Sequence, residues 1–157
     1  MFYFAIPLRA KATTDNWNNV CHRLECTIKS LGVSGNNYKI VIAGHDKPSF
    51  LDDHKEVTFL SVSLSVPSDK SKYMSDKESK KNVARRHILK IAKPNDLFMF
   101  LDADDILSNE FQSEITSKFD SNPDIDDIAI YSGFAYDVNR GKLAYLNGKD
   151  KIFYRNC

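Results

Sequence analysis

Three carboxylates follow one short apolar segment of the chain. Asp102, Asp104 and Asp105 come directly after residues 97–101, LFMFL, and only Ala103 interrupts them. Two like charges about 4 Å apart cost about 1 kcal/mol in water and about 4 kcal/mol at an effective dielectric constant of 20. Protonation, a basic neighbour or a divalent cation relieves this repulsion. Because carboxylate oxygens are hard ligands, the cation they favour is Mg²⁺ or Mn²⁺.

The backbone at this cluster decides which carboxylates act together. If the extended conformation of residues 97–101 continues, Asp102 and Asp104 lie on one side and Asp105 on the other. We therefore predict Asp102 and Asp104 as the metal ligands. The alternative is structural, because acidic residues after a strand often form solvated turns, and Asp105 is also placed to cap the next helix.

The composition is that of one ordinary globular domain. The chain has 157 residues, of which 42% are hydrophobic and 27% charged, and its formal net charge of +1 argues against a nucleic-acid-binding protein. Three cysteines and four histidines show no zinc-ligand spacing, which fits a reducing compartment. No window approaches the roughly 20 apolar residues of a membrane span, and residues 1–8 are too short for a signal-peptide core. We expect a cytoplasmic protein without a transmembrane segment, either free or peripheral to a membrane.

Hydrophobic periodicity predicts alternating strands and helices. Strands are expected at residues 2–7, 38–43, 57–60, 97–101 and 128–133, with an edge strand or hairpin arm at 143–146. The helices are expected to run from Thr14 and Asp15 to a C-cap at Gly32, from about Asp76 to Ala92 before Pro94, and from a cap at Ser108 or Asn109 to about Phe119. The Ser-, Lys- and Asp-rich residues 61–79 predict mostly a mobile loop.

This alternation predicts an α/β fold with a mainly parallel sheet and helices on both faces, in a single domain over residues 1–157. Ligands of open α/β sheets bind beyond the carboxyl ends of the strands. Three loops are expected at that edge, namely residues 7–10, 44–47 and 102–105. The functional site is therefore predicted there.

Four segments of the chain resemble the family 2 glycosyltransferases of the GT-A fold, which use nucleotide-diphosphate sugars. They are FYFAIPLR at residues 2–9, YKIVIAGHDKP at 38–48, DKESKKNVARRHILKIAKPNDLFMFLDADDILSNEF at 76–111 and IAIYSGFAY at 128–136. Only LDADD is specific, because it is similar to the metal-binding DXD element of that family. The Asn that often follows the Pro of the family's first strand is absent here.

The resemblance implies a Rossmann-like GT-A fold and a glycosyltransferase of polysaccharide biosynthesis, which moves a sugar from a nucleotide-diphosphate donor, preferentially a UDP-sugar, to an acceptor hydroxyl. Asp102 would hold the nucleotide ribose or the metal, Asp104 would ligate the Mn²⁺ or Mg²⁺ ion, and Asp46 would approach the base or ribose. The other residues of the implied nucleotide-sugar site are Pro7, Leu8, Arg9, Ala103 and a basic stripe of Lys77, Lys81 and Arg85. The alternative for the stripe is a solvated helix face.

Complete members of this family continue into an acceptor-binding half. The resemblance therefore implies that this chain is the donor-binding part, with a glycan or lipid-linked acceptor bound elsewhere. The catalytic base stays unassigned, and Asp126, Asp127 and Asp137 are candidates by composition only.

Two other functions remain open for the same residues. LDADDIL also resembles the first motif of haloacid dehalogenase-type phosphatases and phosphotransferases, in which Asp102 would be the nucleophile, although that motif normally opens the chain. A non-catalytic nucleotide-sugar-binding module is the second alternative. A nucleotidyltransferase is less well supported, because no Gly-rich phosphate loop lies near the start of the chain.

Overall fold

The computed structural model describes residues 1–147 of the chain. The chain divides into two compact units, residues 1–116 and 117–157. The first unit contains a four-stranded sheet, and the second contains a two-stranded sheet within the residues described.

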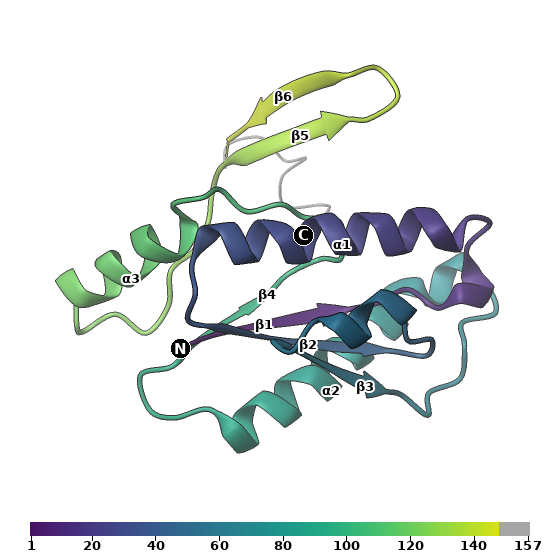
Figure 1. The fold of residues 1–157 in the computed structure, drawn as a ribbon, viewed down its shortest axis with the longest axis horizontal. Helices are drawn as coiled ribbons and strands as arrows, with labels where there is room; N and C mark the ends of the chain where they lie inside the picture. Colours follow the sequence, from purple (N-terminus) through teal and green to yellow (C-terminus); the bar gives the residue numbers. More distant parts are fainter. Residues whose placement is uncertain (148–157) are drawn as a thin grey trace. The chain divides into compact units, whose positions relative to one another are not determined.

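A parallel sheet forms the centre of the first unit. Its strands are β1 (Phe2–Pro7), β2 (Tyr38–Gly44), β3 (Val57–Ser61) and β4 (Leu97–Phe100), in the order β3-β2-β1-β4. All three strand pairs are parallel, with Phe2 opposite both Tyr38 and Leu97. Helix α1 lies over one face of the sheet and α2 over the other (Figure 1). The prediction of an α/β fold with a parallel sheet and helices on both faces is thus confirmed.

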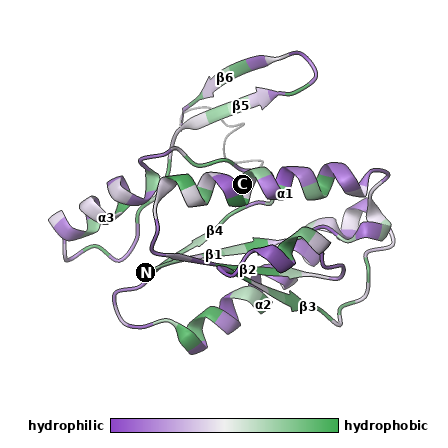
Figure 2. Ribbon diagram, viewed as in Figure 1, coloured by the Kyte–Doolittle hydropathy of each residue, from purple (hydrophilic) through white to green (hydrophobic). Residues whose placement is uncertain are grey.

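The central strand β1 is buried along its whole length, as its continuous apolar sequence predicts. Alternate residues face opposite layers of the core. Phe4 and Ile6 pack with α1, whereas Tyr3 and Ala5 pack with α2. The strands of the sheet are mostly hydrophobic (Figure 2).

Helix α1 (Trp17–Ser34) covers the first face with Leu24, Ile28 and Leu31. It differs from the prediction at both ends. Asn16, not Thr14 or Asp15, is the N-cap, and its side chain accepts a hydrogen bond from the Asn19 N–H. The predicted C-cap at Gly32 is wrong, because the helix continues through Gly32 to Ser34.

Gly32 has another role inside α1. A Cβ atom at this position would lie 3.2 Å from the hydroxyl of Tyr38 in β2. The glycine thus accommodates the close approach of the Tyr38 side chain, which would have to shift slightly to admit a Cβ atom, and it does not mark a turn at the end of the helix.

Helix α2 (Tyr73–Ile91) covers the second face with Ala84 and Ile88 and ends before Pro94, as predicted. The helix starts at Tyr73, three residues before the predicted start at about Asp76. Residues 70–72 form a 3-10 helix, η3 (Lys70–Lys72), capped by Asp69, and α2 follows at once. The predicted loop over residues 61–79 is therefore only partly a loop. Two further short helices are η1 (Lys11–Thr13) and η2 (Ser49–Asp53).

Helix α3 (Phe111–Ser121) begins just after the predicted caps and ends two residues beyond the predicted end. Its first turns belong to the first unit, where Phe111 and Ile115 pack against the core under α1. The buried amide of Gln112 donates hydrogen bonds to the Leu31 carbonyl at 3.1 Å and the Ser34 hydroxyl at 2.8 Å. These bonds fix the start of α3 to the end of α1.

The second unit contains an antiparallel hairpin of β5 (Gly133–Asp137) and β6 (Lys142–Leu146). The predicted arm at 143–146 is confirmed. The predicted strand at 128–133 is wrong, because residues 128–132 form no ladder and pairing begins at Gly133. A strand needs a neighbour to bond its peptide groups, and the turn before Gly141 (φ 61°) supplies one only to residues 133–137.

Candidate functional site

The direction of the chain's crossings changes between β1 and β4. From β1 the chain crosses to β2 through α1 on one face, and from β3 it crosses to β4 through α2 on the other. The strand order therefore reverses at the β1–β4 pair, and ligands of open α/β sheets bind beyond the carboxyl ends of such a pair. The segments leaving the sheet there are residues 8–10 and 101–105.

The segment after β4 is a closed turn. The Leu101 N–H still donates to the Ala5 carbonyl at 3.1 Å, and the Asp105 N–H then donates to the Asp102 carbonyl at 3.2 Å. The Asp105 carboxylate accepts a hydrogen bond from the Asp102 N–H at 3.3 Å. The predicted extended backbone is therefore wrong, because residues 102–105 fold back on themselves once they leave the sheet.

The same turn changes the acidity of Asp105. Burial of the carboxyl group raises its pKa, and the negative charge of Asp102 adds to this effect. The Asp102 N–H and the charge of Lys77 oppose it more weakly. The three carboxylates thus repel one another as the sequence predicts, and Asp105 is the one that shows the repulsion.

Asp102 is held by a basic residue from α2. The Nζ atom of Lys77 lies 2.5 Å from Oδ2 of Asp102, and about a quarter of each side chain is exposed. Lys77 was predicted for the phosphate site from its place in the basic stripe. The structure places it directly at the acidic turn.

Asp104 extends outward from the same turn. Its carboxylate lies 3.6 Å from the guanidinium of Arg23 in α1. The Arg23 side chain is 50% exposed and the Asp104 side chain 57%. An ion pair this exposed is weak and easily exchanged for another partner. The Asp104 carboxylate is therefore open to solvent and accessible to a ligand.

The predicted residues after β1 divide into two groups. Pro7 and Leu8 are buried, with Leu8 in the core next to the backbone of Gly44. Arg9 is exposed, and its guanidinium stacks 5.0 Å from the ring centre of Tyr73 at the start of α2. Of these three, only Arg9 presents a side chain to solvent at the carboxyl edge.

Asp46, after β2, bonds to the loop that follows β1. Its Oδ2 atom accepts a hydrogen bond from the Lys11 N–H at 2.8 Å. The neighbouring His45 ring bonds through Nε2 to the Leu64 carbonyl at 2.9 Å, and its Nδ1 atom is buried without a partner. The loops after β1, β2 and β3 are thus joined at this edge.

The rest of the predicted basic stripe lies along β4. Lys81 pairs with Glu78 at 3.1 Å and lies 5.4 Å over the ring of Phe100. Arg85 is exposed and forms no ion pair with any residue in the described part of the chain. Only Lys77 of the three reaches the acidic turn.

Sequence reasoning missed a buried ion pair in α2. Lys80 is only 1% exposed, and its Nζ atom lies 2.6 Å from Oδ2 of Asp76, one helical turn earlier. The other oxygen of Asp76 is buried without a hydrogen-bond partner. The spacing of four residues predicts such a pair on a helix, but nothing in the sequence marks it as buried. Arg23 and Tyr73 were missed for a similar reason, since each contacts a site residue distant in the sequence.

The acidic turn offers a small ligand set for a metal. Within residues 1–147, no three His, Cys, Asp or Glu side chains gather in a way that would hold an ion. Asp102 and Asp104 do supply hard oxygen donors at an exposed edge, with a third carboxylate beside them. A Mg²⁺ or Mn²⁺ ion commonly takes one or two carboxylates and completes its shell with water and phosphate oxygens. The donor set fits an ion of this kind only together with such a ligand.

Asp137 has a structural role. Its side chain accepts hydrogen bonds from the N–H groups of Asn139 and Arg140 in the hairpin turn. Asp126 and Asp127 lie in the segment before β5 that has no regular structure.

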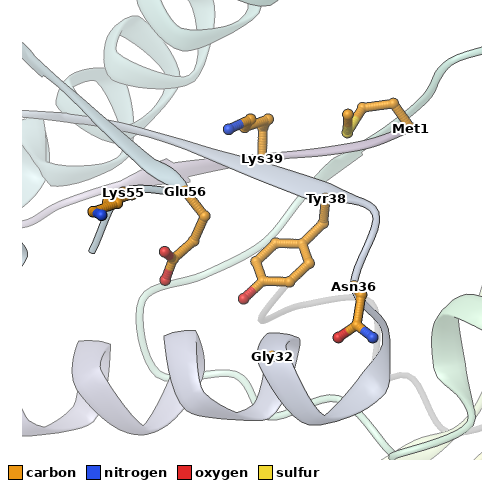
Figure 3. Close-up of a pocket in the computed structure, with 7 residues that line it drawn as sticks. All are labelled: Met1, Gly32, Asn36, Tyr38, Lys39, Lys55 and Glu56. Carbon is orange, nitrogen blue, oxygen red and sulfur yellow. The ribbon is translucent and has the colours of Figure 1, made fainter. Parts of the chain in front are cut away.

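A pocket of about 470 Å³ lies at the opposite end of the sheet, near the amino ends of β1 and β2. Figure 3 shows Tyr38 extending toward α1 at Gly32, with Glu56 beside it. Burial raises the pKa of Tyr38, and the charge of Glu56 adds to this. The other residues that line the pocket are Met1, Asn36, Lys39 and Lys55. This pocket is separate from the predicted site at the carboxyl edge.

Comparison with known proteins gives no assignment. No protein-family model matches the sequence, and no curated protein matches it. Among the described residues, no helix is long and apolar enough to cross a membrane.

Proposed function

We propose that this chain binds a nucleotide-diphosphate sugar at the carboxyl edge of its sheet, as the donor-binding part of a GT-A-type glycosyltransferase. The observation that carries the proposal is the acidic turn at residues 102–105, which leaves β4 where the strand order reverses beside β1. Open α/β sheets bind ligands at this position. The resemblance of LDADD to the DXD element supports the same assignment.

The residues at the turn suit a diphosphate that carries a divalent cation. Asp104 and Asp102 would hold Mn²⁺ or Mg²⁺, which neutralises charge on a departing nucleoside diphosphate. Lys77 already lies at Asp102 and offers a second positive charge to phosphate oxygens. Arg9, which stacks on Tyr73, would bind the nucleotide beside the end of β1. A UDP-sugar donor, a glycan or lipid-linked acceptor and a cytoplasmic location are parts of this proposal.

Nucleotide-dependent thermal stabilisation tests the proposal. UDP or GDP with Mn²⁺ should raise the melting temperature, and a ligand at 100 times its dissociation constant should add about 2.7 kcal/mol to the free energy of unfolding. Asp104→Ala should abolish the stabilisation. The matched control is Asp53→Ala, an exposed aspartate in η2 that forms no ion pair with residues 1–147 and should leave the stabilisation unchanged. Equal stabilisation without a divalent cation would contradict the proposal.

The same variants separate the alternatives. A haloacid dehalogenase-type phosphatase would hydrolyse a simple phosphate ester, and Asp102→Asn would abolish that turnover. A non-catalytic module would be protected by nucleotide and metal but would neither hydrolyse nor transfer the donor sugar. Sugar release or transfer that needs both Mn²⁺ and Asp104 would distinguish a glycosyltransferase from both.

A further inference from the structure

The outward face of the last turns of α2 has an unusual composition. Arg85, Arg86, Leu89 and Lys90 are all exposed, and Lys93 follows just beyond the end of the helix. Residues three and four apart lie on one side of an α-helix, which groups Arg85 and Arg86 with Leu89 and Lys90. We call these four residues, together with Lys93 just beyond the end of the helix, the basic face.

The charges of the basic face are not balanced nearby. No Asp or Glu occurs from residue 79 to residue 95. Arg85, Arg86 and Lys90 form no ion pair with the described residues. Lys93 lies near Asp96, whose carboxylate also pairs with the N-terminal amine at 3.3 Å. At least three of the four cations thus face solvent without a counter-charge.

Helix stability accounts for only part of this pattern. Cations in the last turn of a helix interact favourably with its dipole, which explains Lys90. Arg85 and Arg86 lie before that turn. The first turns of the same outward face carry Ser75, Glu78, Ser79 and Asn82 instead, so on this face the cations lie in the second half of the helix.

An apolar side chain lies at the centre of the basic face. Leu89 is 70% exposed, whereas Ala84 and Ile88 on the core-facing side of α2 are buried. Figure 2 shows hydrophobic residues beside hydrophilic ones toward the end of α2. Binding to an anionic bilayer draws on electrostatic attraction and on buried apolar area, and the basic face offers several cations and one exposed Leu.

We propose that the basic face docks on an anionic lipid bilayer, with the four cations at the headgroups and Leu89 inserted between them. Charge complementarity identifies the partner, because each Lys or Arg near an anionic leaflet adds to binding. Nucleic acid fits less well, since the chain as a whole is only +1 and the face has no Phe, Tyr or Trp on which bases stack. The docking does not depend on the proposed sugar chemistry, because Lys77 and the acidic turn lie at the other end of α2.

Vesicle sedimentation tests this docking. The full chain should bind vesicles of phosphatidylcholine mixed with phosphatidylglycerol, and it should bind vesicles of phosphatidylcholine alone much more weakly. Arg86→Gln with Lys90→Gln should weaken binding about 30-fold, because each lost cation costs about a factor of five. The matched control is Lys11→Gln with Lys29→Gln, which removes two exposed lysines, one in η1 and one in α1 on the opposite face of the sheet, and should leave binding nearly unchanged. Leu89→Gln should weaken binding while leaving its salt dependence unaltered.

Three results would overturn the docking proposal. The first is equal binding to both kinds of vesicle. The second is retention of binding in the Arg86 and Lys90 double variant. The third is tighter binding of a single-stranded oligonucleotide than of the anionic vesicles, lost in the same variant, which would make the basic face a nucleic-acid surface. All five substituted residues are exposed, so urea unfolding of each variant should match the parent protein.

Discussion

Lys77 of α2 and Asp102 of the turn after β4 form an ion pair of 2.5 Å, although 25 positions separate them in the sequence. The contact joins the helix that covers one face of the sheet to the acidic turn at its carboxyl edge. It also places a positive charge beside the acidic turn at residues 102–105. A ligand that binds Asp102 must therefore share it with Lys77 or displace it.

Lys77→Met should destabilise the protein by up to about 1 kcal/mol, because the pair is only partly shielded from water. The loss should exceed that of Lys72→Met, whose lysine lies 3.6 Å from Asp69 and is well exposed. Urea unfolding of the two variants measures the difference. A larger loss in Lys72→Met would contradict the structural role given to the Lys77 pair.

Asp105→Asn should change the dependence of stability on pH. Burial and the charge of Asp102 raise the pKa of Asp105 in the folded protein. Its contribution to stability is then greatest below its ordinary pKa and is lost as the pH rises through the raised value. Asp105→Asn should therefore match the parent at acid pH and become relatively more stable toward neutral pH, as measured by urea unfolding at several pH values.

Asp96 supplies a control of opposite sign. The Lys93 N–H lowers the pKa of Asp96 most, and the N-terminal amine lowers it further against a smaller effect of burial. The stability it contributes is present above its ordinary pKa and is lost as the pH falls through the lowered value. Asp96→Asn should thus be less stable than the parent at neutral pH. A gain in both asparagine variants at neutral pH would contradict this assignment.

Gln112→Ala should cost about 1–3 kcal/mol, because it removes the two hydrogen bonds that the buried amide donates to the Leu31 carbonyl and the Ser34 hydroxyl, and leaves only the bond from that hydroxyl to the carbonyl. Ser113→Ala, at the next position on an exposed side of α3, should change stability by less than about 0.5 kcal/mol. Urea unfolding with both variants gives the comparison. Equal effects would show that α3 is not fixed to α1 by these bonds.

Gly32→Ala combines two opposing effects. Alanine favours a helix over glycine by about 1 kcal/mol, but its Cβ would meet the Tyr38 hydroxyl at 3.2 Å. In the parent protein the substitution should be close to neutral. In a Tyr38→Phe background the hydroxyl is gone, and Gly32→Ala should then stabilise by up to about 1 kcal/mol. Thermal unfolding of the four proteins measures the coupling between the two positions.

The strands of the first unit could be predicted because buried parallel strands have continuous apolar sequences. Residues 2–7 and 38–43 are continuous apolar runs, and each forms a parallel strand at nearly the predicted bounds. Residues 128–133 have the same apolar character, yet only Gly133 enters a ladder. Apolar runs report the tendency to be buried, whereas a strand also needs a partner, which the sequence does not name.

The helix ends and the site geometry were less predictable for a related reason. The sequence predicts a helix end at Gly32, but in the structure Gly32 lies within α1 and faces the Tyr38 hydroxyl, which only the fold brings near. Leu8 was predicted to border a ligand and instead completes the core beside Gly44. The partners Arg23 for Asp104 and Lys77 for Asp102 come from different helices. Such long-range pairs depend on the topology of the sheet.

The parallel pairing of all four strands also affects how the first unit folds. No two of these strands are joined by a tight hairpin, and the β1–β4 pair at the edge of the sheet aligns Phe2 with Leu97, far along the chain. Each ladder can therefore form only when the two ends of a long connecting segment come together, which carries a loop-closure cost in entropy. We expect folding to be slow compared with a helical bundle of similar size, with the β1–β4 ladder, and hence the acidic turn, completed late.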